Sequence, residues 1–554
     1  MNKESRRFFF PIVFLSLVLV GLIIFLAVSI YNHYFGMKHI KSEQIAPEIE
    51  NEDTDYNIVF KGEYGGIAFI EDGYLYLDMD LVNEDWAMGR FFYAENENTV
   101  FFTTSTERLS YEVGSEFYKE RDGKIYVRSS ECEERCGLQY KINYDEHLVM
   151  IRDPNGRTAE VMKSGKYLLT EPDAETLTYT AKLKKGETIE IYDCDTEGYY
   201  FAMDFNGHMG YIEQEDLKTS KANLSRKESL KLDMSDYDVK SDHIFLAFHQ
   251  LYSNSFNYDV YYPIENSWYY TNVVCPTWFH LNTDGSIMTY ANSDYVRTVR
   301  GIGNQVWGMF DNRSDNEMTY NLLSKTEMRD QICQKLLGYC KLYNLHGINV
   351  DFEMMTEETE RYFCQFLREL SVVLRNEGYL LSVDVPVPSE WSDYYQRLRY
   401  SEVCDYVIVM AYDEHYDGSD PGSTSSRPFT ENAIKDMLAE GIPSRKILLG
   451  IPWYTRVWYE EGYGAENGTL TMDGAINMIY DNDLTVVYDE ETGQNYASGW
   501  VGDDYVQIWL EDETSLKFRT DLVKEYDLKG VAAWSYGFEN WQVWEVYDEQ
   551  FWVE

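Results

Sequence analysis

Two carboxylates stand two residues apart at the end of a short apolar run, Gly347-Ile348-Asn349-Val350-Asp351-Phe352-Glu353. Because side chains alternate between the two faces of a β-strand, Asn349, Asp351 and Glu353 are expected on one face. Two acids this close disfavour double ionisation, so one of them keeps its proton near neutral pH, as a general acid must. An isolated pair is equally typical of a strand that leads into the acidic first turn of a helix. The surrounding elements must decide between these interpretations.

From His243 onward, apolar runs alternate with amphipathic stretches, the pattern of a parallel sheet built from βα units. The stretch after Thr356 is one of these predicted helices. About 310 residues with eight apolar runs predict an α/β fold of the (β/α)8 TIM-barrel class, whose active sites lie at the C-terminal strand ends, where Asp351 and Glu353 stand. The candidate strands are Ile244–His249, Val273–Phe279, Gln305–Phe310, Gly347–Phe352, Leu380–Val385, Tyr406–Met410, Ile447–Ile451 and Val531–Trp534.

The charge balance narrows the possible partners. The chain has 554 residues, with 48 Lys plus Arg against 95 Asp plus Glu, a net charge of -47. Nucleic acid is an unsuitable partner, because its binding depends on basic side chains that neutralise phosphates. A neutral or amino-sugar polymer tolerates an acidic protein better than a polyanion does. The length exceeds what a single hydrophobic core supports, so several domains are expected.

Residues Phe8–Ile30 form an uncharged apolar run of 23 positions, long enough to cross a membrane as a helix. Lys3, Arg6 and Arg7 precede this run, which places the short N-terminus in the cytoplasm under the positive-inside rule. A cleaved signal peptide is the competing interpretation, but its apolar region is usually shorter. We therefore predict a single-pass cell-membrane anchor with an extracytoplasmic bulk.

The remaining sequence divides by composition. A polar, acidic stretch over 38–56 is too poor in apolar residues to pack and predicts a tether. Short β-rich runs follow, and residues 156–221 resemble a bacterial SH3-like barrel in Lys184–Ile189 and Gly210–Ile212. The predicted organisation is 1–37 cytoplasmic stub and transmembrane anchor, 38–56 tether, 57–155 small mixed, mainly β domain, 156–221 SH3-like domain, 222–242 linker, and 243–554 barrel with an insertion at about 460–500.

Eight cysteines are spread over the chain, and none of them is part of a metal-site motif. Cys132-x-x-x-Cys136 has no second pair at zinc-site spacing, so a local disulfide and two free thiols are the alternatives for it. An outward-facing domain permits disulfides without requiring them. The sequence thus predicts no metal site.

Several strand ends together carry a resemblance to a known family. Residues 243–554 resemble the family 18 glycoside hydrolases, the chitinase-like barrels. The fourth strand of that family carries D-G-x-D-x-D-x-E, and the corresponding run here extends from His346 to Glu353. The resemblance implies that Glu353 protonates the glycosidic oxygen. It also implies that Asp351 orients the 2-acetamido group of the substrate, whose carbonyl oxygen then attacks the anomeric carbon, a substrate-assisted retaining mechanism that needs no cofactor.

Three further strand ends fit the same resemblance. Met410-Ala411-Tyr412-Asp413 is similar to the family's M-x-Y-D, which implies that Tyr412 binds the acetamido oxygen and Asp413 a sugar hydroxyl. The run from Gly450 to Arg456 is similar to G-x-P-x-Y-x-R, which implies that Tyr454 and Arg456 line the cleft. The run Val531-Ala532-Ala533-Trp534 resembles the family's eighth strand, which implies that Trp534 forms the floor under the reacting sugar. An aromatic face is well suited to this place.

Two positions depart from the chitinase pattern. His346 and Asn349 stand where the pattern has aspartates, and an amide cannot share a proton with Asp351 as a carboxylate can. The form G-x-N-x-D-x-E, together with Pro276–Phe279, resembles the branch of spore cortex-lytic and other peptidoglycan N-acetylglucosaminidases. Asn349 is therefore a candidate substrate-binding residue.

The main hypothesis is a membrane-anchored glycosidase that cuts β-1,4 bonds next to N-acetylglucosamine in peptidoglycan or a related polymer. A non-catalytic, carbohydrate-binding surface protein on the same barrel is one alternative, although such proteins usually lack the acid that Glu353 provides. The other alternative is a chitinase or endo-N-acetylglucosaminidase that acts on chitin or N-glycans.

Overall fold

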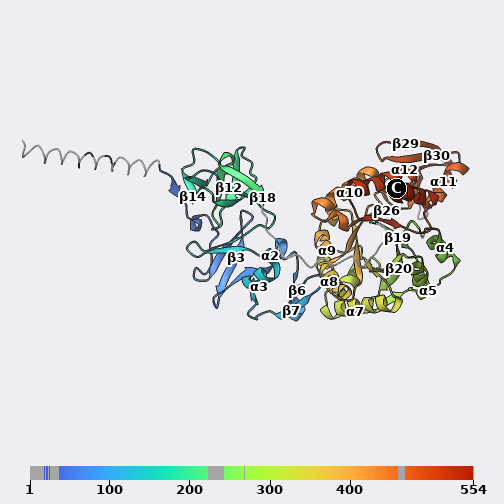
Figure 1. Ribbon diagram of the computed structural model, residues 1–554, viewed down its shortest axis with the longest axis horizontal. Coiled ribbons are helices and arrows are strands. Elements are labelled where there is room, and N and C mark those ends of the chain that lie inside the picture. The colour runs from blue at the N-terminus through green and yellow to red at the C-terminus, as the bar shows by residue number, and fades with distance from the viewer. Residues whose placement is uncertain are drawn as a thin grey trace, which may run out of the picture. The chain divides into compact units, whose positions relative to one another are not determined.

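The computed structural model describes residues 36–221, 242–267, 269–459 and 468–552, together with positions 18, 20, 22, 24 and 26. The chain divides into two compact units (Figure 1). The first unit comprises residues 1–93, 98–100 and 111–228, and the second comprises 94–97, 101–110 and 229–554.

The N-terminal part of the first unit is a seven-stranded sheet in the order β10-β11-β2-β3-β4-β9-β8. Helices α2 (Met79–Asp85) and α3 (Ser129–Cys136) follow β4 and β9 in the chain. Cys132 and Cys136 on α3 are buried and form no disulfide bond. The strands are β2 (Asp55–Phe60), β3 (Glu63–Glu71), β4 (Tyr74–Asp78), β8 (Tyr118–Arg121), β9 (Lys124–Arg128), β10 (Tyr140–Asn143) and β11 (Leu148–Ile151).

An eight-stranded sheet in the order β1-β14-β13-β17-β16-β15-β12-β18 completes the first unit. Its apolar cluster includes Ala159, Leu168 and Ile189. The SH3-like identity of this module stays a prediction. The strands are β1 (Lys38–His39), β12 (Arg157–Val161), β13 (Lys166–Leu169), β14 (Thr178–Leu183), β15 (Thr188–Tyr192), β16 (Tyr199–Met203), β17 (Met209–Glu213) and β18 (Leu217–Lys221).

The segment predicted as a tether, 38–56, is partly ordered, which corrects the sequence-based prediction. Strand β1 pairs in parallel with β14, with Lys38 opposite Thr178. A short 3₁₀ turn, η1 (Ser42–Gln44), follows it. The edge of a sheet offers unpaired backbone groups to any extended segment, so pairing of this kind does not need an apolar sequence. The predicted linker over 222–242 lies outside the described residues except for Asp242.

A three-stranded sheet, β5 (Phe91–Ala94), β6 (Thr99–Thr103) and β7 (Arg108–Glu112), contains the segment 101–110, which belongs to the second unit. This segment packs on helix α8 (Glu357–Arg375) of the barrel. Gln365 Nε2 donates to Thr103 Oγ1 at 3.1 Å, and Ser371 Oγ donates to the Ser105 carbonyl at 3.3 Å. The barrel thus includes a part of the chain that the sequence did not assign to it.

The second unit is a closed barrel of parallel strands, which confirms the predicted TIM-barrel fold. The order is β19-β32-β26-β25-β24-β23-β22-β20, and the pairing of β19 with β20 closes the ring. All eight predicted strands are confirmed within two residues. The strands are β19 (Ile244–His249), β20 (Val273–Leu281), β22 (Gln305–Asp311), β23 (Gly347–Asp351), β24 (Leu380–Pro386), β25 (Tyr406–Met410), β26 (Ile447–Pro452) and β32 (Gly530–Trp534).

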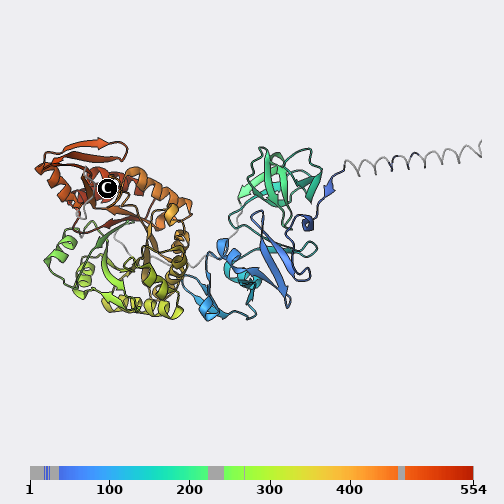
Figure 2. The ribbon, with the colours of Figure 1, turned by 180° about the vertical axis from the view of Figure 1, so that it is seen from behind.

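Helices surround this ring of strands, as both ribbon views show (Figures 1 and 2). Residues such as Ile348 and Val350 of β23 and Val383 of β24 face outward into the core between strands and helices. A smaller apolar cluster fills the inside of the barrel and includes the stacked rings of Trp307 and Tyr406. The other barrel helices are α4 (Tyr258–Ser267), α5 (Ser293–Gly301), α6 (Asn316–Leu323), α7 (Thr326–Tyr343), α9 (Arg397–Val403), α10 (Arg427–Ala439), α12 (Glu513–Glu525) and α13 (Trp541–Tyr547).

The insertion after β26 is longer than predicted. It begins at Tyr454 and ends at Trp509, whereas the sequence indicated about 460–500. The boundary was missed because β27 follows β26 directly, without a turn that composition could mark. Its five-stranded sheet has the order β28-β27-β31-β30-β29 and is covered by α11 (Met472–Asp481). The strands are β27 (Tyr454–Tyr459), β28 (Thr469–Thr471), β29 (Thr485–Asp489), β30 (Gln494–Val501) and β31 (Asp504–Trp509).

The predicted membrane span Phe8–Ile30 lies outside the described residues, apart from five isolated positions. Within the part of the chain that the structure describes, no helix combines the length and the apolar character that crossing a membrane requires.

Candidate active site

The predicted acid pair lies at the C-terminal end of β23. Asn349 and Asp351 project into the barrel, because the alternate residues Ile348 and Val350 face the outer core. Asn349 is fully buried and Asp351 is half-buried, whereas Glu353 follows the strand and is exposed. A desolvated carboxyl therefore stands next to one that solvent and a ligand can reach.

Asn312, which follows β22, holds the main chain of Glu353 from both sides. Its Nδ2 donates to the Glu353 carbonyl at 3.0 Å, and its Oδ1 accepts the Glu353 N–H at 3.0 Å. Ser314 Oγ donates to Glu353 Oε2 at 3.1 Å. Asn312 is buried, so this bracket is shielded from water. The acid is thus fixed at its backbone and oriented at one carboxylate oxygen.

The surroundings raise the pKa of both acids. Burial raises the pKa of Glu353, and the charges of Asp311 and Asp413 raise it further, against the opposing effect of the Ser314 hydrogen bond. The pKa of Asp351 is raised well above its usual value by burial, and then by Asp384, Glu353 and Asp311. A carboxyl whose pKa is raised is suited to giving its proton to a leaving group.

Asn349 is hydrogen-bonded to the neighbouring strand β24. Its Nδ2 donates to Asp384 Oδ1 at 2.8 Å and to Ser382 Oγ at 3.1 Å. All three residues are buried inside the barrel. Asn349 therefore does not open toward a ligand as Glu353 does, and its role as a substrate-binding residue stays a prediction.

Tyr412 follows β25 and lies near these acids. Burial raises the pKa of its hydroxyl well above the usual value, and the charges of Asp384, Tyr454 and Asp351 add to this effect. A Cβ atom at Gly450 would come within 3.2 Å of the Tyr412 ring and 2.5 Å of the Val409 carbonyl. Glycine at this position of β26 thus leaves the space that the tyrosine ring occupies. The hydroxyl stays a neutral donor at physiological pH.

Asp413, Tyr454 and Arg456 form one hydrogen-bonded group. The Tyr454 hydroxyl donates to Asp413 Oδ1 at 2.7 Å, and Arg456 Nη2 donates to the same oxygen at 2.7 Å. Asp413 is exposed and has the left-handed backbone angle φ of +55°. Two donors on one oxygen leave Oδ2 free for a ligand hydroxyl, which is the arrangement expected of a substrate-binding carboxylate.

Trp534 ends strand β32 and packs on the cluster inside the barrel. Its ring lies 5.4 Å from that of Phe248, and its side chain is half-buried. A large apolar face at the C-terminal end of the barrel is thus partly open to solvent, as a platform for a sugar ring requires.

His346 lies at the opposite, N-terminal end of β23, away from the acids. Its Nδ1 accepts the Val306 N–H at 3.0 Å, and Arg300 Nη1 lies 2.9 Å from its Nε2. Burial and then the Arg300 charge lower the pKa of His346 to about 4. The ring is therefore a neutral acceptor that joins elements at the bottom of the barrel.

The site contains two residues that sequence reasoning missed, Asn312 and Asp384. The signal for Asp384 was present, since a charged residue stands inside the apolar run Leu380–Val385 and shares a face with Ser382. Asn312 stands directly after a barrel strand, where catalytic residues of this fold gather. Neither position belongs to the family's strand-end motifs, so the sequence comparison with those motifs did not identify them.

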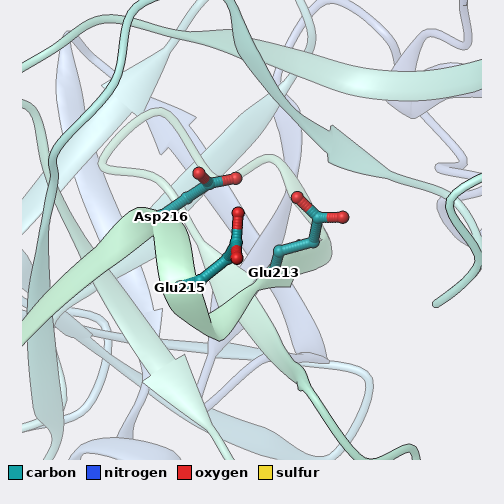
Figure 3. Close-up of side chains that lie close together, drawn as sticks. All are labelled: Glu213, Glu215 and Asp216. Atoms are coloured by element: carbon teal, nitrogen blue, oxygen red, sulfur yellow. The ribbon is translucent and has the colours of Figure 1, made fainter.

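One acidic cluster of the first unit has the geometry of a metal site. Ligand oxygens of Glu213, Glu215 and Asp216 lie within 4.8 Å of one another, and Figure 3 shows the three carboxyl groups together at the end of β17. Lys163 Nζ lies 2.8 Å from Asp216 and 3.0 Å from Glu215. Lys166 contacts Asp216 and lies 3.1 Å from Glu213. Two ammonium groups thus already balance two of the three carboxylate charges, and the cluster carries no metal assignment.

A hollow of about 590 Å³ lies elsewhere in the first unit. The half-buried rings of Tyr192 and Tyr211 form part of its wall. Its acidic residues, Glu63, Asp193 and Asp195, are all exposed, so it lacks a desolvated acid like Asp351. The barrel mouth is therefore the stronger candidate for catalysis.

Comparisons with known proteins agree with the barrel geometry. A sequence model described as glycosyl hydrolases family 18 matches residues 208–539. The chain is 24% identical over 301 residues to an uncharacterized glycosylase, YvbX, of Bacillus subtilis (strain 168), and the match covers 50% of this chain and 83% of that protein. It is 23% identical over 276 residues to the cortical fragment-lytic enzyme of the same organism, covering 48% of this chain and 62% of the enzyme.

A solved structure also matches. The spore cortex-lytic enzyme SleL of Bacillus megaterium QM B1551 gives a TM-score of 0.53 at 18% identity, with 73% of this chain and 89% of that chain covered. At this identity the likeness establishes the fold alone. The chain spans less than two thirds of the length of the cortical fragment-lytic enzyme.

Proposed function

The chain belongs to glycosyl hydrolases family 18, and on this premise we propose that it hydrolyses β-1,4 bonds next to N-acetylglucosamine in peptidoglycan or a related polymer. The observation that carries the proposal is the exposed Glu353, whose pKa is raised, bracketed by Asn312 and paired with the desolvated Asp351. A sugar-binding protein has no need for an acid in this state.

In the proposed mechanism Glu353 protonates the glycosidic oxygen as the bond breaks. Asp351 accepts the N–H of the 2-acetamido group, which turns the carbonyl oxygen of that group toward the anomeric carbon. Tyr412, held neutral by its raised pKa, donates to the same carbonyl oxygen. The acetamido oxygen replaces a protein nucleophile, so the mechanism is retaining and needs no second carboxylate on the far side of the sugar.

Support for a peptidoglycan substrate comes from a relative. The cortical fragment-lytic enzyme of Bacillus subtilis is a curated relative of this chain. The exposed Asp413 Oδ2 and the half-buried face of Trp534 offer contacts to sugar hydroxyls and a sugar ring. Chitin and N-glycans contain the same acetamido sugar, so they are the competing substrates for the same site.

We also propose that the barrel acts outside the cell, held at the membrane by Phe8–Ile30. The support is the uncharged run of 23 residues behind Lys3, Arg6 and Arg7. A labelled full-length protein should remain with the membrane fraction after a salt wash, and a protease added to intact cells should remove the barrel. Release of the full chain by salt would contradict the anchor.

The test of activity is the Glu353→Gln variant, which keeps the shape of the side chain and removes its proton. We expect release of reducing ends from purified peptidoglycan to fall about 10² to 10⁴-fold, which is the contribution of general acid catalysis. Glu357→Gln, an exposed acid in the first turn of α8, is the matched control and should retain activity. Equal activity of Glu353→Gln and the wild type would refute the assignment.

The same assay separates the substrates. Peptidoglycan, chitin oligomers and an N-glycan are digested side by side, and the products are identified by mass. Cleavage of chitin or N-glycan alone would move the assignment to those substrates. Binding without cleavage of any polymer would favour the non-catalytic alternative.

A further inference from the structure

Asp384 is a buried carboxyl inside the barrel that the proposed mechanism does not use. It lies on β24, and Val350 of β23 pairs with Val383 of β24, so Asp351 and Asp384 follow at the same level of neighbouring strands. Both side chains face inward, because Val350 and Val383 face the outer core. Two acids from different strands therefore stand side by side behind Glu353.

The hydrogen bonds around this pair are two donors short. The Asn349 amide gives its N–H groups to Asp384 Oδ1 and Ser382 Oγ. Asn349 Oδ1 and Asp351 Oδ1 are both buried and accept no hydrogen bond. Leaving a buried acceptor unpaired costs about 1 to 3 kcal/mol. A hydrogen on the Asp384 carboxyl would supply one of the two missing donors, the one for Asp351 Oδ1.

The groups that face the pair add no positive charge. The charges of Asp384, Glu353 and Asp311 act on Asp351, and the charge of Glu353 acts on Asp384 against the opposing effect of the Asn349 hydrogen bond. The Cys275 thiol of β20 and the Tyr412 hydroxyl are the other titratable groups beside them, and burial raises the pKa of both, so both are neutral. Burial also raises the pKa of Asp384 to about 8. Ionising both carboxyls together is thus strongly disfavoured.

We propose that Asp384 is a positioning residue that keeps a proton and donates it to Asp351 Oδ1, fixing Asp351 as the ionised acceptor for the substrate. This inference rests on the proposed function of Asp351. The amide of Asn349 on β23 cannot share a proton with Asp351. Asp384 on β24 would share one in its place. Donation to Oδ1 leaves Oδ2 of Asp351 available to accept an acetamido N–H.

The arrangement predicts how the rate depends on pH. When Asp384 loses its proton to solvent, Asp351 loses its donor and faces a second negative charge, so its carboxylate is no longer held in position to accept the acetamido N–H. The alkaline limb of kcat/KM for the free enzyme should therefore fall near pH 8. Asp405, a buried carboxyl at the N-terminal end of β25, lies outside this group, since it accepts the Leu381 N–H and pairs with Arg375.

Two variants of Asp384 separate a proton donor from a packing residue. Asp384→Asn keeps the shape and donates permanently, so kcat at pH 6 should stay within about threefold while the alkaline limb moves up by at least one pH unit. Asp384→Ala removes the donor, and kcat should fall about 10 to 100-fold with KM changed less than threefold. Asp405→Asn, the control, should leave the alkaline limb in place even if it lowers stability.

The outcomes also distinguish this inference from the proposed function. Suppose that the wild type is active and Glu353→Gln is not. The role of Asp384 is then overturned, and the proposed function is kept, if the alkaline limb of Asp384→Asn does not move or if Asp384→Ala keeps the wild-type kcat. If the wild type cleaves no amino-sugar polymer, urea unfolding of the full chain still tests whether Asp384 keeps its proton in the folded state. Wild-type stability relative to Asp384→Asn should fall from pH 5.5 to pH 7.5, and parallel curves would overturn the proposal.

Discussion

Replacing Asn312 with alanine should reduce catalysis without changing any group that reaches the substrate. Asn312 makes four hydrogen bonds of 3.0 Å, two with the Glu353 main chain and one each with Thr319 Oγ1 and the Ser314 N–H. At about 1 kcal/mol net for each bond, the upper limit of the loss is about 4 kcal/mol. Glu353 and Ser314 are exposed, so water can satisfy part of what is lost. We expect a loss of about 2 to 3 kcal/mol.

The effect on the rate follows from the position of the acid. Without the bracket the Glu353 backbone is held only by its chain neighbours, and a displacement of about 1 Å can cost about a hundredfold in rate. We expect kcat to fall about 10 to 100-fold with little change in KM, because Asn312 is buried and does not face the cleft. The assay combines urea unfolding, followed by tryptophan fluorescence, with hydrolysis of purified peptidoglycan.

Asn316 provides the matched control. Its Oδ1 accepts the Thr356 N–H at 2.9 Å, so it holds the start of α8 but not the acid. Asn316→Ala should lower stability and leave kcat within about threefold. The reasoning would be refuted if folded Asn312→Ala kept wild-type kcat, or if both variants lost the same fraction of kcat.

Two further predictions concern stability. Burial lowers the pKa of His208, but hydrogen bonds and charges of Asp204 and Glu146 outweigh this and raise it to about 9. The stabilisation by protonated His208 is therefore complete below pH 6.5 and is lost as pH rises through 9, by up to about 3 kcal/mol. The urea midpoint of the wild type should decline over this pH range, and that of His208→Gln should not. A wild-type midpoint that does not change with pH would contradict the prediction. The Arg519–Glu511 ion pair is fully buried, with Nη2 2.9 Å from Oε1. Arg519→Met should cost about 3 to 5 kcal/mol in urea unfolding, and a loss below about 1 kcal/mol would show the pair to be dispensable.

The parts of the fold that could be predicted are those set by local patterns. The barrel strands are buried on both faces and read as continuous apolar runs, which is why their bounds were recovered. The start of helix α8 was found from the acidic first turn after Thr356, although the Thr356 side chain makes no cap hydrogen bond. Asp351 and Glu353 were found because both lie on one short strand end.

The parts that could not be predicted depend on contacts between segments distant in the sequence. Asp384 meets Asn349 through the register of β23 with β24, and register is not encoded in either strand alone. The pairing of Lys38 with Thr178 is of the same kind. The missed start of the insertion at Tyr454 has a different cause, since no turn separates it from β26.

The packing of residues 101–110 on α8 limits where the enzyme can be cut. An expression fragment beginning at His243 would contain every barrel strand but would strip Thr103 and Ser105 from the buried side chains of Gln365 and Ser371. It would also remove Arg108, which lies 3.5 Å from Glu369. The catalytic barrel therefore cannot be separated from residues 101–110 without losing these contacts. A fragment made for crystallography or for fusion to another protein must start upstream of Phe101 to keep these polar groups satisfied.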